Sequence, residues 1–285
     1  MMTNLKQNRM LSFLAVGLIY IVAAAVGVIV YRRLSYAWWL NLLIADVVAT
    51  VITFGFSVAL GNASVYDPYW SVQPMVILLA FAFRRELTLL RTLLLAAVLL
   101  WGVRLTANWA YTFLNLNHQD WRYTMLKEKT GFFYPFVNFT GIHMVPTLIV
   151  YGCTLPAAYA FLHEGQANGA SVLFFLVSVG AALMQGIADF QMHRFRKEKN
   201  SGFIRDGLWH YSRHPNYLGE ILMWWGIALA VIAVYPQMWY LAAGAFANTV
   251  LFLTVSIPMA DGRQSRKPDF AEYKSETRML LPIRK

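Results

Sequence analysis

Long apolar runs, separated by short polar breaks, are the feature of this sequence that most restricts its fold. They cover residues 11–31, 38–60, 70–83, 89–111, 140–162, 171–190, 217–235 and 238–258. A membrane-spanning helix needs about 20 mostly apolar residues, and all of these runs except 70–83 reach that length. We therefore predict an all-α, polytopic membrane bundle with seven or eight transmembrane helices, the number depending on whether residues 70–83 cross.

The composition agrees with this prediction. Of the 285 residues, 58% are hydrophobic and only 13% are charged, which excludes a soluble enzyme, a disordered chain and a fibrous protein. The single cysteine, Cys153, excludes an internal disulfide and a multi-cysteine metal site, and we expect no metal. There is no Walker loop and no G-x-G-x-x-G motif, so any dinucleotide is held without a Rossmann domain.

The charge distribution predicts an orientation. The chain carries 24 basic and 14 acidic residues. Basic residues concentrate in two segments, 190–216 and 259–285, which flank one predicted helical hairpin and so share a side of the membrane. The positive-inside rule places that side in the cytoplasm, together with the C-terminus. With no soluble domain to carry these charges, we expect membrane lipids as partners and no nucleic acid.

The segment from Gly207 to Glu220 leads from a basic loop into an apolar helix. Arg213 and His214 lie at the mouth of that helix, where backbone N–H groups favour anions. Asn216 and Glu220 are four residues apart, share a helix face, and reach about one turn into the membrane. This pattern suits a cofactor with phosphates at one end and a reactive ring at the other. The alternative is a salt-bridged helix entry.

Two further polar clusters lie at the end of one predicted span and inside another. Asp189, His193 and Arg196 share one helix face, and Arg196 could hold phosphate while Asp189 orients an arginine or a ribose hydroxyl; the alternative is a collar of cytoplasmic charge. In the second cluster, Arg104 and Asn108 share a face. Arg104 needs a partner inside the membrane, which could be Asp46, Asp67 or a cofactor phosphate. The alternative there is a buried structural ion pair.

A stretch of aromatic and polar residues opens the short apolar run. Asp67, Tyr69 and Gln73 in this stretch could line a substrate cavity and supply a proton donor. The alternative is an aromatic belt at the membrane interface with a turn at Asp67-Pro68. His143 lies alone in a span, and we expect it to be a hydrogen-bonded core residue.

The C-terminal part of the sequence resembles the corresponding region of the steroid 5-alpha-reductase family. The features that carry this resemblance are the segment 207–220, the pairing of Asp189 with Arg196, and the tail from Asp269 to Pro282. The similarity covers about residues 180–285 and is nearest to bacterial members of uncharacterised function. It implies NADPH bound within the C-terminal helices and reduction of a carbon–carbon double bond conjugated to a ketone, with hydride added to the β-carbon.

The resemblance also implies site residues. By position, Asp189, Arg196, Asn216 and Arg278 correspond to family cofactor contacts. Five more cofactor-binding candidates lie in the 207–220 segment: Tyr211, Arg213, His214, Tyr217 and Glu220. Two others, Arg104 and Asn108, lie in the span at 89–111. The substrate end departs from the steroid reductases. Trp101 stands where the family has a tyrosine, and no glutamate lies between residues 61 and 83, which leaves Asp67, Tyr69 and Gln73 as the catalytic candidates.

The expected function is NADPH-dependent reduction of a conjugated C=C bond in a steroid-like or other lipid substrate that enters from the bilayer. The protein is expected in the bacterial inner membrane as one domain, with N-terminal helices at 1–60, substrate-side helices and a loop at 61–139, and the cofactor-binding half at 140–285. The alternative is a membrane methyltransferase using S-adenosylmethionine, because Arg213-His-Pro-x-Tyr217 also resembles isoprenylcysteine carboxyl methyltransferases. A third class is a non-enzymatic lipid-binding or structural protein.

Overall fold

The computed structural model describes residues 2–198 and 202–282, and over these residues the secondary structure is helical, without a β-strand. Among these residues, seven helical stretches are long and apolar enough to cross a membrane, so the predicted all-α membrane bundle is confirmed, with seven candidate spans. The short run after Pro68 forms α4 (Tyr69–Ala82), which has only 14 residues and contains Pro74. It is not among the seven.

By their internal contacts, the described residues divide into two compact units. The first unit contains residues up to Ala80 and Leu105–Tyr151. The second contains Phe81–Arg104 and the residues from Gly152 onward. Three helices contribute to both units, α4 by its last two residues, α5 (Leu89–Thr112) and α8 (Val145–Leu162).

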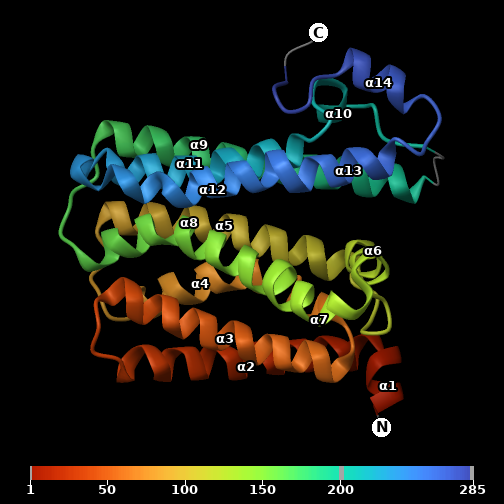
Figure 1. Cartoon of the computed structure of the whole chain (residues 1–285). Helices are drawn as coiled ribbons and strands as arrows, with labels where there is room; N and C mark the ends of the chain where they lie inside the picture. Colours follow the sequence, from red (N-terminus) through yellow and green to blue (C-terminus); the bar gives the residue numbers. More distant parts are fainter. Residues whose placement is uncertain (1, 199–201, 283–285) are drawn as a thin grey trace. The chain divides into compact units, whose positions relative to one another are not determined.

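The first unit is built on an antiparallel pair of long helices, α2 (Arg9–Arg33) and α3 (Trp38–Leu60) (Figure 1). Its other elements are listed in chain order: α1 (Met2–Gln7), the 3-10 turn η1 (Ala63–Tyr66), α4, α6 (Trp121–Thr130), η2 (Gly131–Phe133), α7 (Tyr134–Val137) and the π-helical η3 (Asn138–Met144). Gly61 ends α3 in the left-handed conformation, with φ of 59°, which glycine adopts without a steric penalty. The chain can therefore turn directly into η1.

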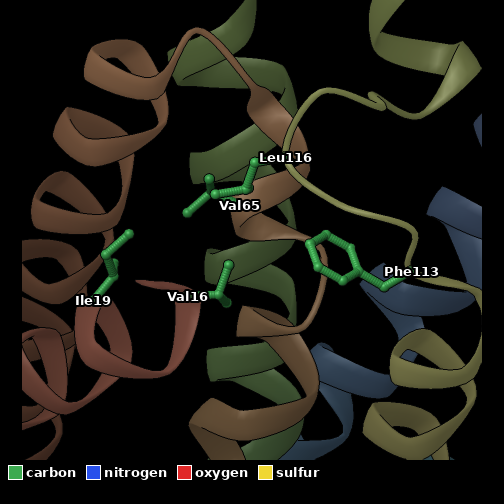
Figure 2. Close-up of a cluster of buried hydrophobic side chains, with 5 residues drawn as sticks. All are labelled: Val16, Ile19, Val65, Phe113 and Leu116. Carbon is green, nitrogen blue, oxygen red and sulfur yellow. The ribbon is translucent and has the colours of Figure 1, made fainter. Parts of the chain in front are cut away.

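Apolar side chains from three parts of the first unit pack together around Val65 of η1 (Figure 2). Val16 and Ile19 of α2 meet Val65, and Phe113 and Leu116 from the loop after α5 complete the cluster. Their burial fixes η1 and thereby sets the start of α4, the helix that carries Tyr69 and Gln73.

The region between the predicted spans 89–111 and 140–162, where we expected the loop, is non-helical only at residues 113–120 and is helical from Trp121 onward. Asp120 caps α6 by accepting a hydrogen bond from the backbone N–H of Arg122, at 2.9 Å, and Pro135 lies in the first turn of α7, a position that suits proline because its missing N–H is not needed there. These local signals produce helix in a segment whose mixed composition suggested otherwise.

The second unit centres on α9 (Gly169–Lys197) and α11 (Pro215–Ile232), which lie side by side with α12 (Ala243–Leu251) along α11 (Figure 1). Asn168 and Ser171 form a capping box that begins α9, and Pro215 occupies the first turn of α11. The remaining elements are α10 (Leu208–Tyr211), η4 (Pro236–Ala242), the π-helical η5 (Phe252–Ser256), α13 (Ile257–Gln264) and α14 (Phe270–Glu276).

Candidate functional site

Arg104 of α5 has its partners on α9. Its guanidinium lies 2.6 Å from the carboxylate of Asp189 and donates a second hydrogen bond to the side-chain oxygen of Gln185. Gln185 and Asp189 are four residues apart, so one face of α9 presents both acceptors. The structure thus gives Arg104 an internal ion pair, with side chains of Arg104 and Asp189 each 16% exposed.

The two other acidic residues that we considered as partners of Arg104 lie in the first unit and have contacts there. Asp46 accepts hydrogen bonds from Tyr69 and Gln73, and Asp67 accepts one from Tyr123. The proposed pairing of Arg104 with either residue is therefore corrected. Sequence spacing did not point to Asp189 as the partner, because the choice depends on which helices pack together.

Glu220 is buried in α11, with 5% of its surface exposed. One carboxylate oxygen accepts a hydrogen bond from the indole N–H of Trp101, at 2.8 Å, and the other accepts one from Trp224, at 2.9 Å. Both oxygens of a buried carboxylate therefore have a donor, which lowers the cost of its burial. Glu220 also interacts with Arg104 and Gln185. The carboxylate of Glu220 therefore belongs to the same polar network as the ion pair between Arg104 of α5 and Asp189 of α9.

Trp101 thus has a defined position in the second unit. It is fully buried and its ring lies 4.8 Å from that of Trp224, edge to face. An indole N–H only donates, so it suits the carboxylate of Glu220. Sequence reasoning missed Trp224, although its spacing of four residues from Glu220 was an available signal.

Asn216 lies one turn before Glu220 on α11. Its side chain is partly exposed, but its Oδ1 atom is buried and has no hydrogen-bond partner. A buried acceptor without a partner costs free energy, and an N–H group of a bound molecule could satisfy it. Asn216 is therefore one position in this motif with hydrogen-bonding capacity left for a ligand, and the buried Nε of Arg213 is another.

Arg213 and His214 contact Asp261 of α13. The distances are 3.1 Å from Arg213 Nη2 and 2.9 Å from His214 Nε2 to the two carboxylate oxygens. Arg213 also donates to the backbone carbonyls of Thr277, at 2.6 Å, and Arg278, at 3.0 Å. These contacts hold the C-terminal tail against the start of α11. They agree with the alternative interpretation of residues 207–220, in which the charged residues at the start of this helix form salt bridges.

The other predicted cofactor residues occupy different environments in the second unit. Tyr217 packs on His214, with ring centroids 5.2 Å apart and planes within 4° of parallel. Three exposed residues lie around the ends of α9, α10 and the tail: Arg196, Tyr211 and Arg278. Arg196 interacts electrostatically with Asp189 and with Arg263, so two like charges face each other at this end of α9.

The three catalytic candidates belong to the first unit. The hydroxyl of Tyr69 donates to one oxygen of Asp46, at 2.9 Å, and the amide of Gln73 donates to the other, at 2.5 Å. Tyr69 and Gln73 are one turn apart on α4, so they converge on a single carboxylate of α3. Sequence reasoning did not select Asp46 as a site residue, although it is the only acidic residue in its apolar run.

Asp67 lies apart from this group, before α4. It accepts a hydrogen bond from Tyr123, and burial raises the pKa of its carboxyl to about 6. Asn108, which lies in the part of α5 assigned to the first unit, is partly exposed and its backbone carbonyl accepts a hydrogen bond from Thr112. His143 is fully buried with Nδ1 2.9 Å from the carbonyl of Asn138, which confirms the predicted hydrogen-bonded core histidine. Over the described part of the chain, no group of three or more His, Cys, Asp or Glu residues is placed to hold a metal ion.

A protein-family model described as "Protein of unknown function (DUF1295)" matches residues 53–277. The chain belongs to this family. The DUF1295 region includes α4 and all the helices of the second unit, hence Asp67, Glu220 and Asp261, whereas Asp46 and Arg278 lie outside it.

A fission-yeast protein is also similar to this DUF1295 member. It is an uncharacterized protein of Schizosaccharomyces pombe, 26% identical over 219 residues. The aligned region covers 65% of this chain and 61% of the yeast protein, so the chain spans less than two thirds of that relative's length. No solved structure matches the chain.

Proposed function

We propose that the protein is an integral membrane reductase that uses NADPH to reduce a conjugated C=C bond in a hydrophobic substrate. The observation that carries this proposal is the polar network of the second unit, in which Arg104, Asp189 and Glu220 meet within helices α5, α9 and α11. Ionisable groups are costly inside a membrane and usually mark a functional site there. The resemblance to the steroid 5-alpha-reductase family supports the assignment to NADPH.

The residues of the second unit fit parts of a dinucleotide. Asn216 Oδ1 is a buried acceptor without a partner, which suits the carboxamide N–H of nicotinamide. Arg196 is exposed beside the like charge of Arg263, which suits a phosphate. Arg213 and His214 already contact Asp261, so to hold phosphate they must share their donors with that carboxylate. Asp189 and Glu220 would set the position of Arg104, with Tyr211, Tyr217 and Arg278 at the edge of the site.

The bound dinucleotide would supply the hydride that adds to the β-carbon of the substrate. Among the catalytic candidates, Tyr69 is the leading proton donor, because its O–H is held by Asp46. Gln73 would fix Asp46 in place, and Asp67 would provide a second carboxyl group. An apolar substrate would enter from the lipid. We further propose a bacterial inner-membrane location with a cytoplasmic C-terminus.

Direct binding tests this proposal. We expect the detergent-purified protein to bind NADPH, with Asn216→Ala weakening binding about tenfold through loss of one hydrogen bond. Glu220→Ala should weaken it as well, while the protein still folds. Unchanged affinity in both variants would remove the site assignment, and no binding of NADPH or NADH would refute the reductase.

A methyltransferase is the second candidate, and one observation favours it. The methyltransferase pattern continues with an acidic pair after the final span; here only Asp261 is nearby, but it contacts both Arg213 and His214 of the shared motif. Tight binding of S-adenosylmethionine without NADPH binding would favour this class. Binding of none of these cofactors would favour the third class, a lipid-binding or structural membrane protein.

A further inference from the structure

A buried polar cluster in the first unit has hydrogen-bonding capacity that cofactor binding by the second unit does not use. It begins at Asp46, which is 5% exposed within the spanning helix α3. Tyr69 and Gln73 donate to its two oxygens, and within residues 2–198 and 202–282 Asp46 makes no ion pair. A carboxylate in a membrane helix without a cationic partner is costly.

The cluster continues through two tyrosines to a histidine. Tyr69 stacks on Tyr66, with ring centroids 5.2 Å apart, and Tyr66 packs against His143 at 4.7 Å. His143 is fully buried and belongs to the π-helical η3, a kind of helical distortion that is frequent at functional sites. Asp46 and His143 are thus connected by packed rings.

The hydrogen bonding of His143 shows which ring nitrogen carries the proton and which has no partner. Its Nδ1 lies 2.9 Å from the backbone carbonyl of Asn138, and a carbonyl only accepts, so Nδ1 carries the proton. The Nε2 of the neutral ring is then an acceptor. This Nε2 is buried and has no hydrogen-bond partner.

Gln73 presents a second acceptor. Because its amide nitrogen donates to Asp46, its Oε1 is the remaining group, and Oε1 is also buried and without a partner. The nearby hydroxyls bond to one another instead: Thr147 lies 2.7 Å from Tyr66 and 3.0 Å from Thr50, oxygen to oxygen. The hydrogen-bonding capacity left in the cluster is therefore that of acceptors, beside one carboxylate.

We propose that the first unit binds an apolar molecule by a hydrogen-bond donor group that the molecule carries, either a hydroxyl or an ammonium. A hydroxyl donates its single proton to one of the two acceptors, His143 Nε2 or Gln73 Oε1, whereas an ammonium has further protons and takes Asp46 as its counter-charge. A molecule without a donor group leaves both acceptors without a partner. This site goes beyond the proposed reductase and does not depend on dinucleotide binding.

The test uses the full-length protein in phosphatidylcholine nanodiscs with three tritiated probes of equal chain length, 1-dodecanol, dodecylamine and dodecane. We expect saturable binding, about one molecule per protein, for the alcohol or the amine and none for the alkane. No saturable binding of either donor probe, or equal binding of the alkane, would overturn the proposal. NADPH binding is measured on the same samples, so failure of the reductase proposal is recorded separately.

Variants assign the site to these residues. His143→Leu or Gln73→Met, which keeps the side-chain size, should weaken binding of the donor probe roughly tenfold, depending on which acceptor the probe uses. Asp46→Asn separates the two donors, since it should weaken the amine at least tenfold and leave the alcohol nearly unchanged. The control is His163→Leu in the second unit, whose Nδ1 also lies near a backbone carbonyl. Equal affinity of His143→Leu, Gln73→Met and the control would place the probe elsewhere and refute the site.

Discussion

At the scale of single residues, the first prediction concerns the contribution of the Arg104–Asp189 ion pair to stability. Replacing Arg104 by Leu leaves Asp189 partly buried without its ion-pair partner, because Arg104 supplies the 2.6 Å contact. We expect Arg104→Leu to lower the free energy of unfolding by about 2–3 kcal/mol, measured by denaturant unfolding in detergent with tryptophan fluorescence.

The control is the exposed pair of Arg194 and Glu198 on the same helix, whose side chains are 73% and 51% exposed. Arg194→Leu should change the free energy of unfolding by no more than about 0.5 kcal/mol. A similar loss in both variants would mean that the Arg104 effect does not come from its buried partner. Adding Asp189→Asn to Arg104→Leu should recover part of the loss, since the two residues are coupled.

Asp67 makes a pH-dependent prediction at the same scale. Burial raises the pKa of its carboxyl from 3.8 to about 6, so the folded state holds this proton more tightly than the unfolded state. The stabilising contribution is present below pH 4 and is lost as the pH rises to about 6. We expect Asp67→Asn, which keeps an acceptor for Tyr123, to raise the free energy of unfolding at pH 7 by roughly 2 kcal/mol and to have little effect at pH 4. An effect of equal size at both pH values would show that ionisation of Asp67 is not its cause.

At the scale of elements, close contact between α9 and α11 depends on glycine. A Cβ atom at Gly226 would lie 2.8 Å from the backbone carbonyl oxygen of Phe174, and backbone cannot move aside as a flexible side chain can. Ser178 donates a hydrogen bond to the Met223 carbonyl, at 3.1 Å, and this bond requires the same close approach. Small residues permit such packing where a membrane removes the hydrophobic driving force.

We therefore expect Gly226→Ala to lower the free energy of unfolding by about 1–3 kcal/mol, the usual cost of overpacking. Gly180→Ala is the matched control, because Gly180 lies in α9 and a Cβ there meets nothing within 4 Å. That variant should be neutral or stabilise the helix by up to about 1 kcal/mol. Equal destabilisation by the two changes would contradict the close-contact explanation.

At the scale of the whole molecule, the charge distribution predicts which ends of the second unit face the cytoplasm. Cys153, the single cysteine, is buried, so an introduced cysteine can be labelled selectively. Gln166 and Ser275 are both exposed, the first in the loop before α9 and the second in the basic tail. We expect a membrane-impermeant maleimide to label Gln166→Cys in intact cells and Ser275→Cys only after permeabilisation. The reverse pattern would invert the proposed orientation, and labelling of the unmodified protein would invalidate the assay.

The sequence by itself determined the helical membrane class, because hydrocarbon leaves the backbone of an apolar run no stable alternative to helix. Periodicity also placed Asn216 with Glu220, and Asp189 with Arg196, on single helix faces. It could not choose the partners of charged residues, since these come from other helices. Only tertiary structure decided that Arg104 meets Asp189, that Asp261 holds Arg213 and His214, and that Asp46 receives Tyr69 and Gln73. The physical reason is that helix formation depends on neighbours along the chain, whereas the pairing of buried polar groups depends on which distant helices pack together.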